Sequence, residues 1–278
     1  MGEPVVVTGA HSVLGSMLCA HLAGQQEPVI GLITPWADSA DLAIQTVRAD
    51  LRKPLPSDVC DLIRRSGQVF HLAWARGAGT RTENIAMIDH LMSCVRAPAH
   101  FHLMSSVAAG PRAESEYGKS KWEATQRVRK AGGNVLVCGL VSGDHPKLPF
   151  NQLQAAVGRS WLSLELKQPV KVYPISTVQL FEAITGILRA PPPPGCYGLF
   201  QKNGPDLNQL LRQIEQGSPR RRWKLTLRQQ WIEQVARVLK KLKLPPHSAW
   251  ERALTLLQKD AALLDDLPQL NGVRPPSR

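Results

Sequence analysis

Short apolar runs alternate with helix-like stretches over the first half of the chain. We expect strands at residues 5–7, 28–33, 44–47, 69–73, 101–106 and 134–138. Helical periodicity around Leu14, Leu18 and Leu22, and over residues 83–96 and 117–129, predicts helices between these strands. Strands that alternate with helices form parallel sheets that helices cover on both faces. The pattern therefore predicts a doubly wound α/β fold.

The pattern changes after residue 143, and the second half is mostly helical. We expect a helix over residues 152–166, a strand near 170–173 that returns to the sheet, and a helix over 178–188. Further elements are expected at the strand 196–200 and the helices 207–214, 227–242 and 249–264. The chain is thus divided into an α/β domain, residues 1–143, and a smaller, mostly helical part, residues 144–278.

Composition places the chain among ordinary folded proteins. Of its 278 residues, 43% are hydrophobic and 20% are charged, which suits a sizeable core and argues against disorder. No apolar run is long enough to cross a bilayer. The first strand follows Met1 so closely that no signal peptide is visible. We expect a cytoplasmic protein that does not bind a membrane.

Cysteine and histidine positions give no sign of a metal site. The cysteines are odd in number, widely spread and without a Cys-x-x-Cys pair: Cys19, Cys60, Cys94, Cys138 and Cys196. We expect reduced and mostly packed thiols. His100 and His102 lack a third ligand nearby, so no metal is expected.

Basic residues are concentrated in one segment. The net charge is +12, and residues 212–243 hold ten Lys or Arg against two Glu, a net charge of +8. Within it, Arg220 and Arg222 flank Arg221, and a guanidinium pair of this kind suits a substrate diphosphate. The alternative is a solvated loop. No nucleic-acid-binding module is present, so nucleic acid is not an expected partner.

A glycine-containing turn follows the first strand, where a Rossmann-like fold places the pyrophosphate of a dinucleotide. In residues 8–15, Gly9 permits the tight turn and Gly15 permits close packing of helix on strand, while Ser12 takes the place of the usual middle glycine. The expected contacts to the cofactor come from Gly9, His11, Ser12, Val13, Leu14 and Gly15. The alternative is an ordinary strand–helix turn.

Tyr117 and Lys121 are four residues apart and therefore share one face of a helix. A free tyrosine has a pKa of about 10, and a nearby ammonium lowers it toward the range of a useful acid–base group. A serine hydroxyl near this pair would hold the oxygen of the substrate. The preceding strand ends in Ser105 and Ser106, which supply that hydroxyl.

These residues resemble the extended and atypical short-chain dehydrogenase/reductases, in particular the NAD-dependent epimerase/dehydratase family. The similarity spans most of the chain with decreasing strength. It rests on residues 8–15 (Thr-Gly-Ala-x-Gly-x-x-Gly), 49–51 (Asp-Leu), 69–73 (Val-x-His-Leu-Ala), 83–85, 105–110 and 117–121. Residues 138–143 stand in place of the family's Arg-Pro-x-x-Val-x-Gly and depart from it. Residues 175–178 stand in place of its Val-x-Asp-Val, with Ser176 or Thr177 instead of the acid.

The resemblance implies roles for individual residues. Ser106, with Ser105 as alternate, would position the substrate oxygen, Tyr117 would transfer its proton, and Lys121 would tune Tyr117 and hold the nicotinamide ribose. Further cofactor contacts would come from Thr34, Asp50, Leu51, Leu72, Ala73 and Trp74. The second strand ends at Thr34 without an acid, which favours NADP slightly over NAD. His11 would approach the 2′-phosphate.

The sequence therefore predicts an NAD(P)-dependent oxidoreductase or epimerase. It would move a hydride at a hydroxyl or ketone carbon, in a nucleotide-linked sugar or another phosphorylated small molecule bound by residues 144–278. The resemblance also implies a homodimer. The alternative is a non-catalytic sensor or scaffold that binds NAD(P) on the same fold, a hypothesis favoured by Ser12 and by the altered later motifs.

Overall fold

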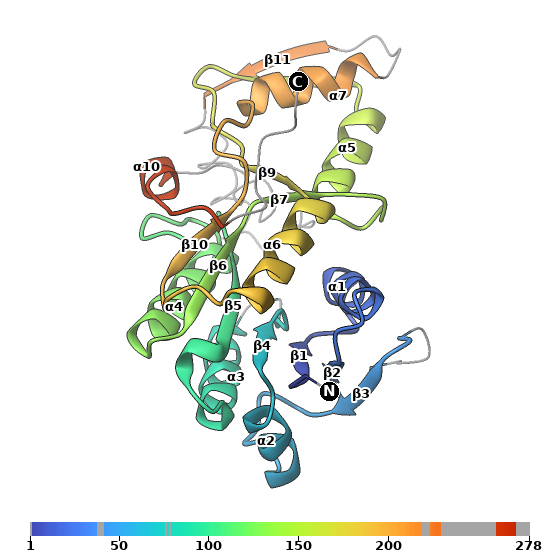
Figure 1. The fold of residues 1–278 in the computed structure, drawn as a ribbon. Coiled ribbons are helices and arrows are strands. Elements are labelled where there is room, and N and C mark those ends of the chain that lie inside the picture. The colour runs from blue at the N-terminus through green and yellow to red at the C-terminus, as the bar shows by residue number, and fades with distance from the viewer. Residues whose placement is uncertain are drawn as a thin grey trace.

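The computed structural model describes residues 2–37, 42–75, 77, 79–217, 223–228 and 260–270. Its centre is a seven-stranded sheet in which every pair of neighbours is parallel (Figure 1). The strands are β1 (Val5–Thr8), β2 (Val29–Ile33), β3 (Gln45–Arg48), β4 (Gln68–His71), β5 (Phe101–Ser106), β6 (Asn134–Cys138) and β10 (Cys196–Leu199). Their order is β10-β6-β5-β4-β1-β2-β3. The direction of the strand order reverses between β1 and β4, as in a Rossmann-like fold.

The inner strands are almost entirely buried and rich in apolar residues because both faces of the sheet are covered. All residues of β1, β2, β4 and β6 are buried, whereas the edge strand β3 is polar and partly exposed. Alternate residues of β1 point to opposite cores, with Val5 and Val7 in one cluster and Val6 in the other. The sheet therefore separates two hydrophobic cores.

Helices cover both faces of this sheet. They are α1 (Val13–Gly24) and α6 (Thr177–Arg189) on one side, and α2 (Ser57–Arg64), α3 (Arg81–Cys94) and α4 (Glu116–Lys130) on the other. On the second side, Arg127 of α4 forms a two-pronged ion pair with Asp89 of α3 at 2.8 and 2.9 Å. The doubly wound α/β fold predicted from the sequence is confirmed.

The second part of the chain builds smaller layers beyond the central sheet (Figure 1). Its elements are α5 (Pro149–Arg159), α7 (Leu207–Gln216), α10 (Ala261–Asp265) and two parallel strand pairs, β7 (Leu140–Ser142) with β9 (Pro174–Ser176) and β8 (Leu162–Leu166) with β11 (Trp223–Leu227). A third core forms between β8, α7 and α5, and its buried members are Leu166, Val170, Val172, Leu207, Leu210, Leu211 and Ile214.

Two predictions for this part need correction. The helix predicted over 152–166 ends at Arg159, because the Ser160 hydroxyl bonds Leu162, and the alternating Leu-Ser-Leu-Glu-Leu then forms β8. The strand expected near 170–173 does not return to the central sheet: Lys171 makes one isolated bridge, and β10 takes the edge position instead. The Rossmann-like sheet therefore draws a strand from beyond residue 143.

Other predictions fare differently. The helices predicted at 178–188 and 207–214 are confirmed by α6 and α7, and α2 was not predicted at all. The helices predicted at 227–242 and 249–264 fall mostly outside the described residues, and Leu227 itself ends β11. Among the described helices, none combines the length and apolarity needed to cross a membrane.

Cys60 of α2 and Cys94 of α3 form a disulfide, with their Cα atoms 4.9 Å apart. The prediction of reduced thiols is therefore wrong for this pair. The two residues are 34 positions apart in sequence, and the packing of α2 against α3 brings them together. Cys19, Cys138 and Cys196 are free, as predicted.

Candidate active site

The carboxyl ends of five neighbouring strands place the predicted site residues along one edge of the sheet. Parallel strands all end at the same edge, and ligands of such folds bind there, at the point where strand order reverses. The glycine turn follows β1, Thr34 follows β2, and Asp50 follows β3. Leu72–Trp74 follow β4, and Ser105 and Ser106 end β5.

Two glycines of the turn are required by close approach. Gly9 has a φ of +69°, and a Cβ there would lie 2.7 Å from the backbone nitrogen of Ala73. A Cβ on Gly15 would lie 2.2 Å from the carbonyl oxygen of Gly9. The turn therefore packs backbone against backbone, which only glycine allows.

Ser12 caps helix α1. Its hydroxyl accepts a hydrogen bond from the backbone N–H of Gly15 at 3.1 Å, and its backbone is extended. No acidic residue lies in the first turn of α1, so the positive end of the helix dipole is not neutralised there. His11 is exposed beside the cap, and partial desolvation lowers the pKa of its ring. The serine thus has a structural role at the position where the related motif has glycine.

Two polar contacts fix the segment after β4. The backbone N–H of Ala73 donates to the Thr8 hydroxyl at 3.2 Å, and that hydroxyl bonds Nδ1 of the buried His71 at 2.8 Å. Asn84 of α3 pairs with both the N–H and the carbonyl of Ala75, at 2.9 and 3.0 Å. The walls of the predicted cofactor cleft are therefore tied to β1 and α3.

The two serines at the end of β5 point in different directions. Ser105 is buried, and its hydroxyl bonds the Thr125 hydroxyl on α4 at 2.8 Å. Ser106 is half-buried, and its hydroxyl accepts from the N–H of Ala108 at 3.2 Å. Ser106 is therefore the more exposed of the two serines, whereas the hydroxyl of Ser105 is buried and bonded to α4.

Helix α4 begins immediately before Tyr117. Ser115 caps it by accepting from the N–H of Gly118 at 3.0 Å. A Cβ on Gly118 would lie 2.4 Å from the carbonyl oxygen of Ala108, so the first turn of α4 packs directly on the loop after β5. The half-buried Tyr117 in this turn is thereby held close to the end of β5.

Lys121 lies one turn further along α4 and is almost completely buried, at 4% exposure. Its ammonium donates to the carbonyl oxygen of Met104 at 2.7 Å and lies 3.5 Å from the centre of the Trp74 ring. It lies 5.9 Å from the centre of the Tyr117 ring, and Trp74 meets Tyr117 edge to face at 6.4 Å. Trp74, Tyr117 and Lys121 therefore form one cluster.

A distant segment holds the loop between Ser106 and Tyr117. The Asp260 carboxylate, 8% exposed, accepts from Nε of Arg112 at 2.8 Å and from its backbone N–H at 3.3 Å. A Cβ on Gly110 would collide with the same carboxylate. The sequence offered no signal for this contact, because the partners are 148 positions apart.

Two residues that the sequence analysis did not identify, Trp36 and Arg52, follow the carboxyl ends of β2 and β3. Arg52 forms a two-pronged ion pair with the predicted cofactor residue Asp50, and its guanidinium stacks on Trp36. The hydrogen bonds from Arg52 lower the pKa of the Asp50 carboxyl. The only signal in the sequence was a tryptophan two residues beyond Thr34, and the structure shows that it is exposed.

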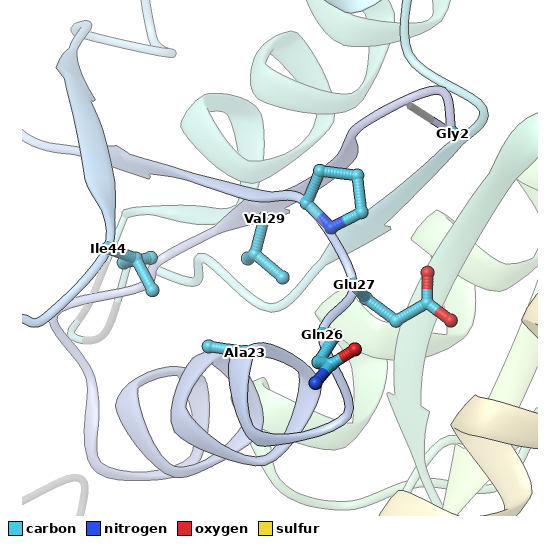
Figure 2. Close-up of a pocket in the computed structure, with 7 residues that line it drawn as sticks. Gly2, Ala23, Gln26, Glu27, Val29 and Ile44 are labelled. Atoms are coloured by element: carbon cyan, nitrogen blue, oxygen red, sulfur yellow. The ribbon is translucent and has the colours of Figure 1, made fainter.

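Three further observations complete the description of the candidate site. The predicted diphosphate clamp, Arg220 and Arg222, falls outside the described residues. Within the part of the chain that the structure describes, no group of three or more His, Cys, Asp or Glu could hold a metal. A cavity of about 390 Å³ opens at the other edge of the sheet (Figure 2). It is lined by Gly2, Ala23, Gln26, Glu27, Pro28, Val29 and Ile44.

Comparisons with known proteins find the fold but no sequence relative. No protein-family model matches the chain, and no curated protein matches it in sequence. A nucleoside-diphosphate-sugar epimerase from Pseudomonas aeruginosa is similar in structure, with a TM-score of 0.67 and 14% identity over 94% of this chain and 97% of that one.

Two further solved structures of similar fold contain bound ligands. UDP-glucose 4-epimerase from Thermotoga maritima, with UDP-glucose, has a TM-score of 0.61 and 14% identity over 81% of this chain and 86% of that one. MoeE5, in complex with UDP-glucuronic acid and NAD, has a TM-score of 0.60 and 16% identity over 81% and 85%. These likenesses establish the fold that the chain shares with nucleotide-sugar epimerases.

Proposed function

We propose that this protein is a nicotinamide-dependent oxidoreductase or epimerase that acts on a hydroxyl or ketone carbon. The observation that carries the proposal is the cluster of Trp74, Tyr117 and Lys121 beside β5, which ends at Ser106 at the carboxyl edge of the sheet, two strands from the glycine turn. The fold shared with nucleotide-sugar epimerases supports the same reaction class.

The residues at this edge fit a dinucleotide. Gly9 and Gly15 leave the backbone bare at the start of α1, and that helix end carries no acid to repel a pyrophosphate. The backbone at Leu72–Trp74 would line the next part of the cofactor, and Asp50 and Leu51 would meet the adenine. Thr34, in place of an acid, supports NADP over NAD as the preferred cofactor.

Each residue of the cluster then has a defined task. Tyr117 gives or takes the proton of the substrate hydroxyl, and Ser106 donates a hydrogen bond to the same oxygen. The buried ammonium of Lys121 favours the phenolate form of Tyr117, and the Met104 carbonyl fixes the position of that ammonium. Bound at this edge, a nicotinamide supplies or accepts the hydride.

A nucleotide-linked sugar is the proposed substrate class. The MoeE5 and Thermotoga maritima structures carry UDP-linked ligands, and the strongly basic segment 212–243 suits a diphosphate. The homodimer and the cytoplasmic location inferred from the sequence remain proposals of the same kind.

The experiment is a search for hydride transfer with the purified chain. NADPH, NADH, NADP and NAD would each be incubated with a panel of UDP- and dTDP-linked sugars and their 4-keto forms. Nicotinamide absorbance would report net oxidation or reduction, and product NMR would report epimerisation. We expect turnover of at least one substrate. Cofactor binding without turnover on the whole panel would favour the sensor or scaffold hypothesis instead.

A further inference from the structure

The loop after β2 presents a tryptophan at the carboxyl edge of the sheet. Trp36 is 65% exposed, although tryptophan is usually well buried. Arg48, the last residue of β3, donates to the carbonyls on both sides of Trp36, those of Pro35 and Ala37, at 2.7 and 2.8 Å. The hydrogen bonds from Arg48 therefore fix the backbone that carries the exposed indole.

One face of this indole is covered by an arginine. The guanidinium carbon of Arg52 lies 4.9 Å from the centre of the Trp36 ring. Arg52 donates from Nε and Nη2 to the two oxygens of Asp50, at 2.9 and 3.1 Å. Because guanidinium has five N–H donors in a fixed plane, this pair orients the group and leaves Nη1 without a hydrogen bond to any described residue.

The charge at this corner suits an anion. Among the described residues, β3 and the turn after it supply three cations, Arg48, Arg52 and Lys53. The acids that act on Arg52 are Asp50, which is already paired with it, and Glu83 near the start of α3. The described residues that follow β2, 34–37, hold no carboxylate. A phosphate that approaches Nη1 of Arg52 would meet a net positive charge and an open guanidinium edge.

We infer that Trp36 and Arg52 recognise the adenosine end of a dinucleotide that carries a 2′-phosphate. Trp36 stacks on the adenine, and the Nη1 side of Arg52 holds the phosphate. A merely structural Arg52–Asp50 ion pair needs no exposed indole beside it, and the stacked pair lies on the same edge as the glycine turn. The inference rests on the proposed function only in assuming that a dinucleotide binds at this edge.

The test uses mononucleotides, which need no hydride transfer. Isothermal titration of the full chain with 2′,5′-ADP and with 5′-AMP should give at least tenfold tighter binding of 2′,5′-ADP. Arg52→Gln should reduce that ratio to about one, and Arg52→Lys should retain part of it because a charge remains without the fork. Trp36→Ala should weaken both ligands by a similar factor.

Matched variants control for indirect effects. Arg64→Gln removes another exposed arginine that pairs with an aspartate, and Trp161→Ala removes another exposed indole; both should bind like the parent chain. Equal affinity for the two nucleotides, no binding of either, or an unchanged ratio in Arg52→Gln would overturn the inference. Turnover that proceeds equally with NADH and NADPH would also overturn it while leaving the proposed function intact. Tight 2′,5′-ADP binding without any turnover would do the reverse.

Discussion

Position 9 requires glycine for two reasons. Its φ of +69° disfavours any side chain, and a Cβ would lie 2.7 Å from the nitrogen of Ala73. Gly9→Ala should therefore lower the free energy of unfolding by about 1–3 kcal/mol from backbone strain alone and should weaken nucleotide binding. Thermal melting and nucleotide titration check both effects.

Gly24 provides the matched control for this variant. It ends α1, and a Cβ there would meet nothing within 4 Å. Gly24→Ala should be neutral or slightly stabilising, because alanine is the better helix former. If Gly9→Ala melted and bound nucleotide like Gly24→Ala, the close-packed turn described here would be incorrect.

Lys121→Met tests whether the charge of Lys121 serves the proposed reaction. Lys121→Met keeps much of the buried stem and removes the ammonium that lies between Met104, Trp74 and Tyr117. We expect a loss of turnover on the order of 10²–10⁴-fold and an activity profile displaced to higher pH, because the phenolate of Tyr117 loses a cation.

The control for Lys121 is Lys119→Met. Lys119 is exposed and pairs only loosely with Glu116, at 3.6 Å. Its replacement should leave the rate and the pH profile of turnover unchanged. A Lys121→Met enzyme with the parent pH profile would contradict an electrostatic role for this lysine.

At the residue scale, local rules predicted local structure. The strand, turn and helix around residues 8–15 are confirmed, and Tyr117 and Lys121 lie on one helix, as their spacing predicts. Ser105 and Ser106 were left as alternatives, and the alternation of β5 puts the first hydroxyl against Thr125 and leaves the second half-buried. Arg52 and Trp36 were missed because their contact links loops after two different strands.

At the scale of elements, one covalent link joins α2 to α3. A disulfide that closes a loop of 34 residues lowers the conformational entropy of the unfolded chain, which stabilises the folded state by about 4 kcal/mol. Reduction, or Cys60→Ser with Cys94→Ser, should lower the free energy of unfolding by this order. Denaturant titration with and without reductant measures it.

Thiol counting supplies an independent check of that link. Alkylation of the denatured, unreduced chain should label three cysteines, and all five after reduction. Cys196→Ser should leave the stability difference between oxidised and reduced protein unchanged, since Cys196 is free. Five reactive thiols before reduction would contradict the bond between Cys60 and Cys94.

Element prediction was weakest beyond residue 143. In the first half, continuous apolar runs mark the strands of the sheet, and the predicted bounds of these strands differ from the observed ones by only one or two residues. Residues 152–166 contain apolar residues at both helical and alternating spacing, so periodicity could not place the break at Ser160. Which segment forms the edge strand beside β6 depends on tertiary packing, and β10 rather than residues 170–173 occupies that edge.

At the scale of the whole molecule, two buried histidines make stability depend on pH. Burial lowers the pKa of His71 and of His102 to about 3, and unfolded histidine titrates near 6.5. Between these values the unfolded chain binds protons that the folded chain does not. The stability contribution is therefore present above pH 6.5 and is lost as the pH falls toward 3.

The expected size of this effect is measurable. The free energy of unfolding should fall by about 4 kcal/mol between pH 7.5 and pH 5, roughly half from each histidine. His102→Gln, which keeps a polar partner for Gln68, should remove about half of this dependence. Denaturant titrations of the parent chain and of His102→Gln at both pH values measure this. If both proteins lost the same stability between pH 7.5 and pH 5, the role given to His102 would be contradicted.

Long-range contacts limit what the sequence predicts about the whole molecule. Asp260 braces the loop between Ser106 and Tyr117 from the far end of the chain, and Asp265 pairs with Lys171 at 2.8 Å. Neither contact has a local sequence signature, because each depends on how α10 docks. The fold class, by contrast, follows from the alternation of strands and helices alone.

The central claim is that Tyr117 transfers the substrate proton, and Tyr117→Phe tests it most directly. Hydride transfer and cofactor affinity should be measured side by side on the parent chain, on Tyr117→Phe and on the control Tyr197→Phe, whose hydroxyl bonds the Pro193 carbonyl on the surface. We predict that Tyr117→Phe binds cofactor normally and loses turnover by about 10²–10⁴-fold, while Tyr197→Phe keeps full activity. Full turnover by Tyr117→Phe would contradict the account.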